Sequence, residues 1–201
     1  RASTLDDETT FGIQSSQKVG PTVADDIKTS AIWSIIFALI AIALYILVRF
    51  RNIAFSLGAV VGLVHDVLFI LGIYSIFYSI MPFSLEIDQS FIAAILTVIG
   101  YSINDTVVVF DRIRENVGLY PKRALNQLIN MSVNSTLSRT FSTSFSTALP
   151  LLAMFIFGGE TIRGFVFAIL LGVIVGTYST IFIASPIAYD IQQKQAKKLN
   201  K

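Results

Sequence analysis

The 201-residue sequence contains no cysteine and a single histidine, His65. The missing thiols exclude a disulfide framework and a thiolate metal site, and a lone histidine does not make a zinc site. Charge is also scarce: 14% of the residues are charged, whereas 54% are hydrophobic, and the mean hydropathy is +0.70. A soluble domain does not need so much apolar material to fill its core. We therefore expect a polytopic membrane protein with no metal and no cofactor.

Five apolar runs are each long enough to cross a bilayer as a helix, at about 20 residues per span. The runs are continuously apolar rather than alternating, which favours helices over a β-barrel. The predicted fold class is an all-α polytopic membrane protein. Its transmembrane helices are predicted at about residues 31–48, 53–80, 91–115, 133–157 and 162–189.

Charged residues predict the orientation of these spans. By the positive-inside rule, three basic regions are cytoplasmic. They are Arg49 with Arg51; Arg112, Arg114, Lys122 and Arg123; and Lys194, Lys197, Lys198 and Lys201. The regions on the other side are mainly acidic. The N-terminus is therefore expected outside and the C-terminus in the cytoplasm.

The two ends of the chain complete the predicted domain organisation. Residues 1–29 are polar and acidic and are expected to be the end of an extracytoplasmic domain with its linker. Residues 30–190 are the predicted transmembrane bundle, and residues 191–201 a basic cytoplasmic tail. A first span that starts outside must be carried across, and the sequence has neither an initiating Met nor a signal peptide. We therefore expect a longer polypeptide with at least one preceding span.

A short segment at the inner surface is also predicted. Residues 122–131 combine basic side chains with Leu125, Leu128 and Ile129. This pattern is typical of an amphipathic helix lying on the membrane surface, and a solvated connector is the alternative.

The stretch GYSINDTVVVFDRIREN, residues 100–116, sets a carboxylate inside the third span. An ionisable residue at such a depth costs a few kcal/mol and is a functional hypothesis by default. Thr97, Tyr101 and Asp105 are spaced four apart, with Asn104 close to the same helical stripe. We expect Asp105 to be central to the function.

The fourth span carries a matching polar stripe around an arginine. Ser135, Arg139, Thr143 and Thr147 again recur every four residues. Asp105 and Arg139 lie on consecutive antiparallel spans, so we expect them to meet. Burial favours the neutral acid, whereas a guanidinium favours the anion, so a small rearrangement decides whether Asp105 holds a proton. A salt bridge that only pairs two helices is the alternative.

Small residues mark two packing faces. The second span has Ala54, Gly58, Gly62 and Asp66 at intervals of four, a spacing that lets helix backbones approach closely. His65 beside Asp66 is compatible with a proton relay or with hydrogen bonds that only hold helices together. The last span continues this spacing as a seam of small residues, which predicts packing: Gly164, Ala168, Gly172, Gly176, Thr180 and Ala184.

Catalysis is not expected from this sequence. It contains no nucleophile–base pair, no phosphate-binding glycine loop and no metal-ligand cluster. Intramembrane proteolysis would need two facing aspartates, and the glycine context expected around the second one is missing.

Several motifs together resemble the SecF family of bacterial protein-export membrane proteins, or the SecF half of a fused SecDF. Besides residues 100–116, they are VGPTVADDI at residues 19–27, GLVHDVLF at 62–69, SRTFSTSFSTALPLLAMFIFGGETIRGF at 138–165 and GVIVGTYSTIFIASPI at 172–187. The resemblance implies a resistance-nodulation-division fold, in which this chain holds five helices of a six-helix SecF bundle.

The resemblance also implies a function, partners and a location. SecF works with SecD in the bacterial inner membrane, where the proton motive force assists preprotein export through SecYEG after SecA has acted; YajC and YidC are further possible partners. Asp105 then matches the proton-carrying aspartate and Arg139 the arginine beside it, while Asp66 has a supporting role. The alternatives are a proton-coupled half-transporter of lipid or small molecules and a translocase scaffold without proton coupling.

Overall fold

The computed structural model describes residues 21–199, so the predictions for residues 1–20 lie outside the described part of the chain. The regular secondary structure of this part is all helical, with no strand. Its elements are α1 (Pro21–Phe50), α2 (Ile53–Phe77), α3 (Gln89–Leu119), α4 (Leu125–Phe157), α5 (Glu160–Ser179), the π-helix η1 (Thr180–Ala184) and α6 (Ser185–Leu199). Five helical stretches are long and apolar enough to cross a membrane, the last of them formed by α5, η1 and α6 together. The prediction of an all-α membrane protein with five spans is confirmed.

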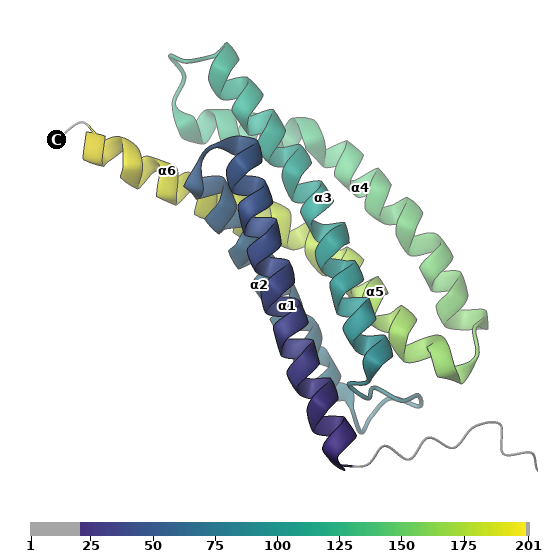
Figure 1. The fold of residues 1–201 in the computed structure, drawn as a ribbon. Coiled ribbons are helices and arrows are strands. Elements are labelled where there is room, and N and C mark those ends of the chain that lie inside the picture. The colour runs from purple at the N-terminus through teal and green to yellow at the C-terminus, as the bar shows by residue number, and fades with distance from the viewer. Residues whose placement is uncertain (1–20, 200–201) are drawn as a thin grey trace, which may run out of the picture.

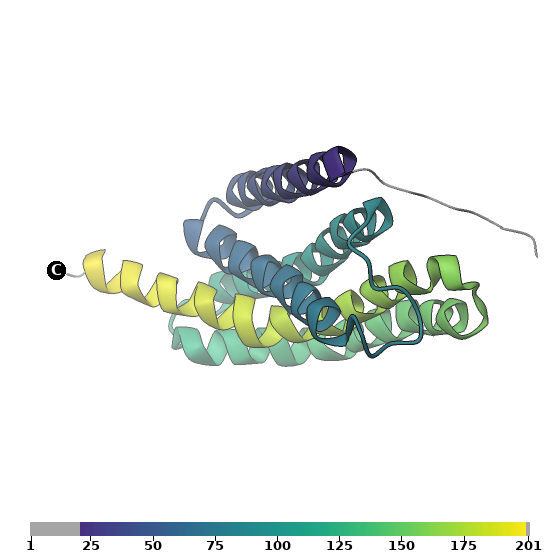
Figure 2. The ribbon, with the colours of Figure 1, turned by 90° about the horizontal axis from the view of Figure 1, so that it is seen from below.

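The helices pack as a bundle around α3 and α5, as Figures 1 and 2 show. Helix α1 lies on one side against α2 and α3, and α4 lies on the other side against α3 and α5. Only 6% of the apolar segment of α1 is buried inside the bundle, compared with 56% of the apolar segment of α2, so α1 lies at the periphery. Helix α6 carries the last span beyond the bundle toward the C-terminus (Figure 1).

Polar side chains cap the starts of α2 and α3. The Asn52 side chain accepts a hydrogen bond from the Ala54 N–H at 2.9 Å, and Asp88 accepts one from the Phe91 N–H at 2.8 Å. Such caps satisfy backbone donors that have no partner within the helix. Between α1 and α2 the chain reverses through Arg51, which adopts a left-handed φ of 51°. The second span ends at Phe77, three residues earlier than the predicted limit at 80.

Two boundary predictions are wrong. Residues 21–29 are the first turns of α1 rather than a linker, and Pro21 suits a helix start because its missing N–H has no partner there. The segment 122–131 is not a separate surface helix, since α4 runs unbroken from Leu125 and buries Leu128 and Ile129 inside the bundle. The prediction of a basic cytoplasmic tail says nothing of its secondary structure, and in the structure α6 extends from the last span through this region to Leu199.

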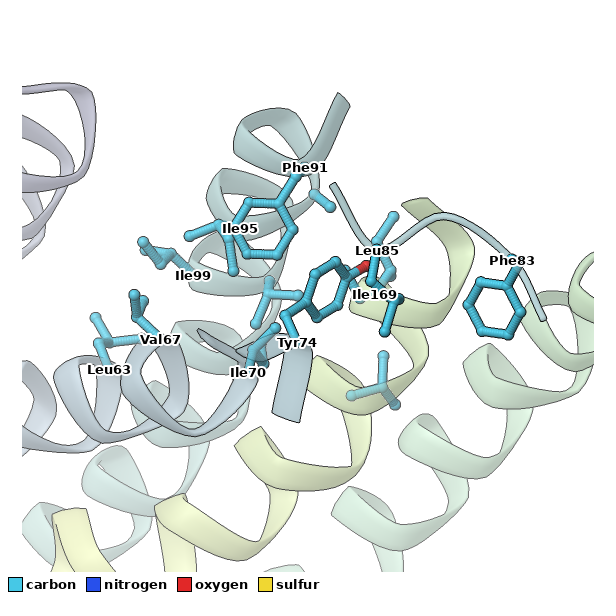
Figure 3. Close-up of a cluster of buried hydrophobic side chains, with 14 residues drawn as sticks. Leu63, Val67, Ile70, Tyr74, Phe83, Leu85, Phe91, Ile95, Ile99 and Ile169 are labelled. Carbon is cyan, nitrogen blue, oxygen red and sulfur yellow. The ribbon is translucent and has the colours of Figure 1, made fainter. Parts of the chain in front are cut away.

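Two apolar clusters hold the bundle, one toward each end. Figure 3 shows the first, in which Tyr74 of α2 packs against Phe91 of α3 with ring centroids 4.5 Å apart. The Tyr74 hydroxyl donates to the Gly164 carbonyl at 2.5 Å, which ties α2 to the start of α5. The second cluster groups residues from six elements around Phe50, Phe55 and Phe110. Lipid is as apolar as these side chains, so their contribution is close packing rather than transfer out of water.

Candidate functional site

Asp105 lies in the middle of α3 on the face toward α4. It is 4% exposed, and its Oδ2 atom is buried with no hydrogen-bonding partner among the described residues. The side chains that act on its carboxylate are Arg139 and Ser144, both on α4. A buried polar atom without a partner is costly, so this carboxylate is poorly suited to serve as a static packing element.

Arg139 acts on Asp105 electrostatically but makes no direct ion pair with it among the contacts of residues 21–199. Its side chain is exposed and turns toward a polar pocket of about 520 Å³ between α3 and α4. The two residues therefore lie near each other, as the sequence suggests, without closing into a salt bridge. The long apolar stem of arginine allows its charged end to reach a polar region.

Hydroxyl groups connect this region to the last span. The Ser144 and Thr177 hydroxyl oxygens are 2.5 Å apart, and Thr177 also donates to the Val173 carbonyl at 2.9 Å. A hydroxyl has one proton to donate. With Thr177 donating to Val173, Ser144 donates to Thr177 and keeps its lone pairs free. Its oxygen can then accept a hydrogen bond from Asp105 when that carboxyl group is protonated.

A second buried carboxylate, Asp66, lies at the crossing of α2, α3 and α5. It is 0% exposed. The Ser102 hydroxyl donates to its Oδ2 at 2.7 Å, His65 Nδ1 lies 3.2 Å from its Oδ1, and the Ser179 hydroxyl also interacts with it. Both carboxylate oxygens thus have partners, and these partners come from all three helices. This arrangement is suited to holding the helices together.

The remaining residues of the predicted polar stripes have more local partners. Thr97 and Thr143 donate to carbonyls of their own helices, and Asn104 is exposed. Tyr101 donates to Thr147 of α4 at 3.4 Å. Ser135 accepts from Arg112 Nε at 3.1 Å at the polar pocket. The structure therefore does not gather these side chains into a single network around Asp105.

Sequence reasoning missed the hydroxyl partners of both carboxylates. Ser102, Ser144, Thr177 and Ser179 were not singled out, nor was the bond between Thr106 and Thr180, whose hydroxyl oxygens are 2.9 Å apart. The sequence does carry a signal for two of them, because Ser102 is adjacent to Tyr101 and Ser144 to Thr143, and Tyr101 and Thr143 belong to the two polar stripes. The π-helix at Thr180–Ala184 was also missed.

The small residues of the two packing faces lie at close helix contacts. Gly58 and Gly62 of α2 lie against Ala184, so that a Cβ on Gly58 would sit 2.7 Å from the Ala184 carbonyl oxygen. Gly172 faces Val98 of α3, and Gly176 faces Ser102. Gly164 lies against the Ser84 carbonyl in the loop before α3. An added side chain would meet backbone at Gly58 and Gly164, and a stiff, branched neighbour at Gly172.

Together these features describe a site that can hold and release a proton. It offers one buried carboxylate with a free oxygen, a cation on the facing helix and adjacent hydroxyls. Within residues 21–199 no group of three His, Cys, Asp or Glu side chains could hold a metal ion. The arrangement supports charge movement between two helices.

Comparisons with known proteins identify relatives of this chain. Residues 2–194 match the family described as "Protein export membrane protein SecD/SecF, C-terminal". The protein translocase subunit SecF of Rhodothermus marinus is 51% identical over 180 residues, which are 90% of this chain and 58% of that protein. The protein of the same name from Rhodobacter capsulatus is 49% identical over 179 residues, 89% of this chain and 52% of that protein. This chain thus spans little more than half the length of these curated relatives.

A solved structure is similar as well. A crystal structure of SecDF in a super-membrane-facing form matches with a TM-score of 0.75 and 37% sequence identity. The match covers 91% of this chain and 24% of that chain. The resemblance inferred from the sequence motifs is confirmed.

Proposed function

Because this chain belongs to the SecD/SecF family of protein export membrane proteins, we propose that it is the membrane part of a SecF-type translocase subunit in which Asp105 and Arg139 couple proton movement to preprotein export. The observation that carries this proposal is the buried Asp105 carboxylate, which has one oxygen without a partner and an arginine acting on it from the next helix.

The proposed mechanism follows from the charges. When Asp105 is ionised, the carboxylate attracts the Arg139 guanidinium and draws α4 toward α3. When Asp105 takes up a proton, this attraction is lost, and the carboxyl group can donate to Ser144 while Arg139 turns to the polar pocket. Each charge that crosses 100 mV releases about 2.3 kcal/mol, which is enough to bias two arrangements of a helix pair.

The proposal extends to partners and place. We place the chain in the bacterial inner membrane with SecD, at the SecYEG channel and downstream of SecA, with YajC and YidC as further neighbours. Residues 1–29 would then face outside and residues 191–201 the cytoplasm, as the basic regions favour.

The test is preprotein export into sealed vesicles that carry the complete SecDF complex, with and without an imposed proton gradient. We expect the gradient to accelerate export for the wild type and not for Asp105→Asn, since Asn keeps the volume of the side chain and removes its titration. Asp190→Asn is the matched control, because Asp190 is exposed on α6. An equal gradient response in wild type and Asp105→Asn would exclude coupling at Asp105 and favour a scaffold. Loss of the assembled complex in Asp105→Asn would mean that Asp105 and Arg139 only hold two helices together.

A second candidate function is transport of an apolar small molecule by a proton-coupled half-transporter. It is favoured by a groove of about 470 Å³ between α4 and α5, lined by aromatic side chains that include Phe141, Phe145, Tyr178 and Phe182. Copurification with SecYEG separates the two functions, because only the export function requires that association. Phe145→Ala should leave export unchanged if the groove has no part in it.

A further inference from the structure

The polar pocket between α3 and α4, here called the arginine pocket, is lined by charged residues from three helices. Its volume is about 520 Å³. Its lining residues are Arg49, Val108, Asp111, Arg112, Arg114, Glu115, Ser135, Thr136 and Arg139. All of them lie at the same end of the bundle, where the apolar run of α1 and that of α3 give way to charged residues.

The lining has more positive than negative charge. Four arginines and two carboxylates give a formal net charge of +2 (4 − 2). Asp111 is shared by Arg49 at 2.9 Å and Arg114 at 3.2 Å, and Glu115 pairs with Arg112 at 2.7 Å. Arg139 has no ion pair among the described residues. The acids are therefore already engaged, and the excess positive charge faces the pocket.

One guanidinium in the pocket is held in place from both helices. Arg112 Nε donates to Ser135 Oγ of α4 at 3.1 Å, and the Arg112 Nη1 atom bonds Glu115 of α3. A planar guanidinium fixed in this way loses little conformational freedom on binding and matches the geometry of phosphate oxygens. Arg112 and Arg139 thus present two cations to a common space, one pre-positioned and one without an anionic partner.

We infer that the arginine pocket binds the phosphate of an anionic lipid headgroup. Lipid phosphates lie at the level where membrane helices exchange apolar for charged residues, and basic pockets between helices at the cytoplasmic side bind such headgroups. The volume exceeds what one phosphate needs and leaves room for the attached glycerol. A free phosphate ion offers the same chemistry, so the experiment must separate the two sources. The inference goes beyond proton coupling and does not depend on it.

The test is native mass spectrometry of the complete SecDF complex, released from micelles that contain equal amounts of phosphatidylglycerol and phosphatidylcholine with identical acyl chains. We expect the wild type to retain phosphatidylglycerol preferentially. Arg112→Gln should reduce that retention about tenfold, the size expected for losing a charge-assisted hydrogen bond. Arg123→Gln is the matched control: it removes the same charge at the same end, but Arg123 lies 4.7 Å from the Tyr120 ring, outside the pocket.

Two further arms complete the design. Arg112→Lys keeps the charge and loses the planar guanidinium, so we expect it to retain an intermediate amount of phosphatidylglycerol. The midpoint of thermal unfolding should be unchanged in this variant, so that its lower retention cannot come from misfolding, which could by itself explain a loss in Arg112→Gln. Inorganic phosphate at constant ionic strength is the soluble probe. If it binds in an Arg112-dependent way while phosphatidylglycerol is not retained, the lipid source is wrong. Equal losses in Arg112→Gln and Arg123→Gln, or none in either, would overturn the site.

Discussion

Two aspartates are buried inside the same bundle, and their surroundings differ. Asp66 is 0% exposed and has hydrogen-bonding partners at both oxygens, which come from its own helix, α3 and α5. Asp105 is 4% exposed, and one of its oxygens has no partner among the described residues. A satisfied carboxylate fixes one arrangement of helices, whereas an unsatisfied one next to a cation leaves a second arrangement accessible. Depth alone therefore does not identify a coupling residue.

The packing around the two residues differs in the same direction. Asp66 belongs to α2, whose apolar segment is 56% buried and which packs closely on the last span through Gly58 and Gly62. Asp105 faces α4, and only 11% of the apolar segment of α4 is buried inside the bundle. A helix with few packed neighbours moves at a lower cost than one packed on several sides. We expect α4 to be the element that responds when Asp105 changes its charge.

The largest effect on stability is expected for Asp66→Ala, which tests whether Asp66 is a structural carboxylate. The substitution leaves the buried Ser102 hydroxyl without its acceptor in a dry interior, so we expect the free energy of unfolding to fall by about 3 kcal/mol. Thermal unfolding of the full-length subunit in detergent would measure it, with Asp190→Ala as the control. The folded fraction should still respond to a proton gradient. A stable Asp66→Ala protein that lost the gradient response would mean that Asp66 also carries the proton.

Gly172→Ala tests the packed side of the comparison. A methyl group there would collide with the branched Val98 side chain, and overpacking of this kind costs about 2 kcal/mol. Gly72→Ala is the matched control, since nothing lies within 4 Å of its Cβ position and alanine favours the helix. We expect the midpoint of thermal unfolding to fall for the first and to stay or rise for the second. If both behaved alike, the Gly172 contact would have no energetic weight.

Ser144→Ala tests the surroundings of Asp105. It removes the hydroxyl that interacts with Asp105 and bonds Thr177. Losing one such hydrogen bond is worth about 1 kcal/mol, so the gradient-driven part of export should fall about fivefold. Ser146→Ala is the control, because Ser146 is exposed and bonds a carbonyl of its own helix. Equal export by the two variants in the vesicle assay would remove Ser144 from the site.

The smallest effect is expected for Asp111→Asn, which changes a half-buried carboxylate six residues after Asp105 on the same helix. Its pairs with Arg49 and Arg114 involve side chains that are 35–48% exposed. Pairs of this kind contribute about 0.5 kcal/mol and weaken with salt. We expect an unchanged gradient response and a small decrease in thermal midpoint that vanishes at high salt. A decrease as large as that of Asp66→Ala would place Asp111 among the structural carboxylates.

The sequence predicts the spans well because continuous apolar runs have one stable solution in lipid. Asp105 and Arg139 could be singled out because charges in such runs are rare. Their partners could not be predicted, since a serine or threonine inside a helix bonds either its own preceding turn or a neighbouring helix. Thr143 does the first and Ser144 the second. The surface helix was mispredicted because Leu128 and Ile129 suit a membrane surface and a bundle interior equally.

The small residues of the last span do not lie on one straight line along the helix. Residues spaced four apart advance about 40° beyond a full α-helical turn, so the seam winds around the last span instead of running straight along it. It meets the Ser84 loop at Gly164, α3 at Gly172 and α2 at Ala184. The last span is therefore a common axis against which three other parts of the bundle are aligned in succession. Deleting one residue within η1 would allow an ordinary α-helical turn there, because a π turn holds one residue more than an α turn, and it would leave the contacts before η1 in place.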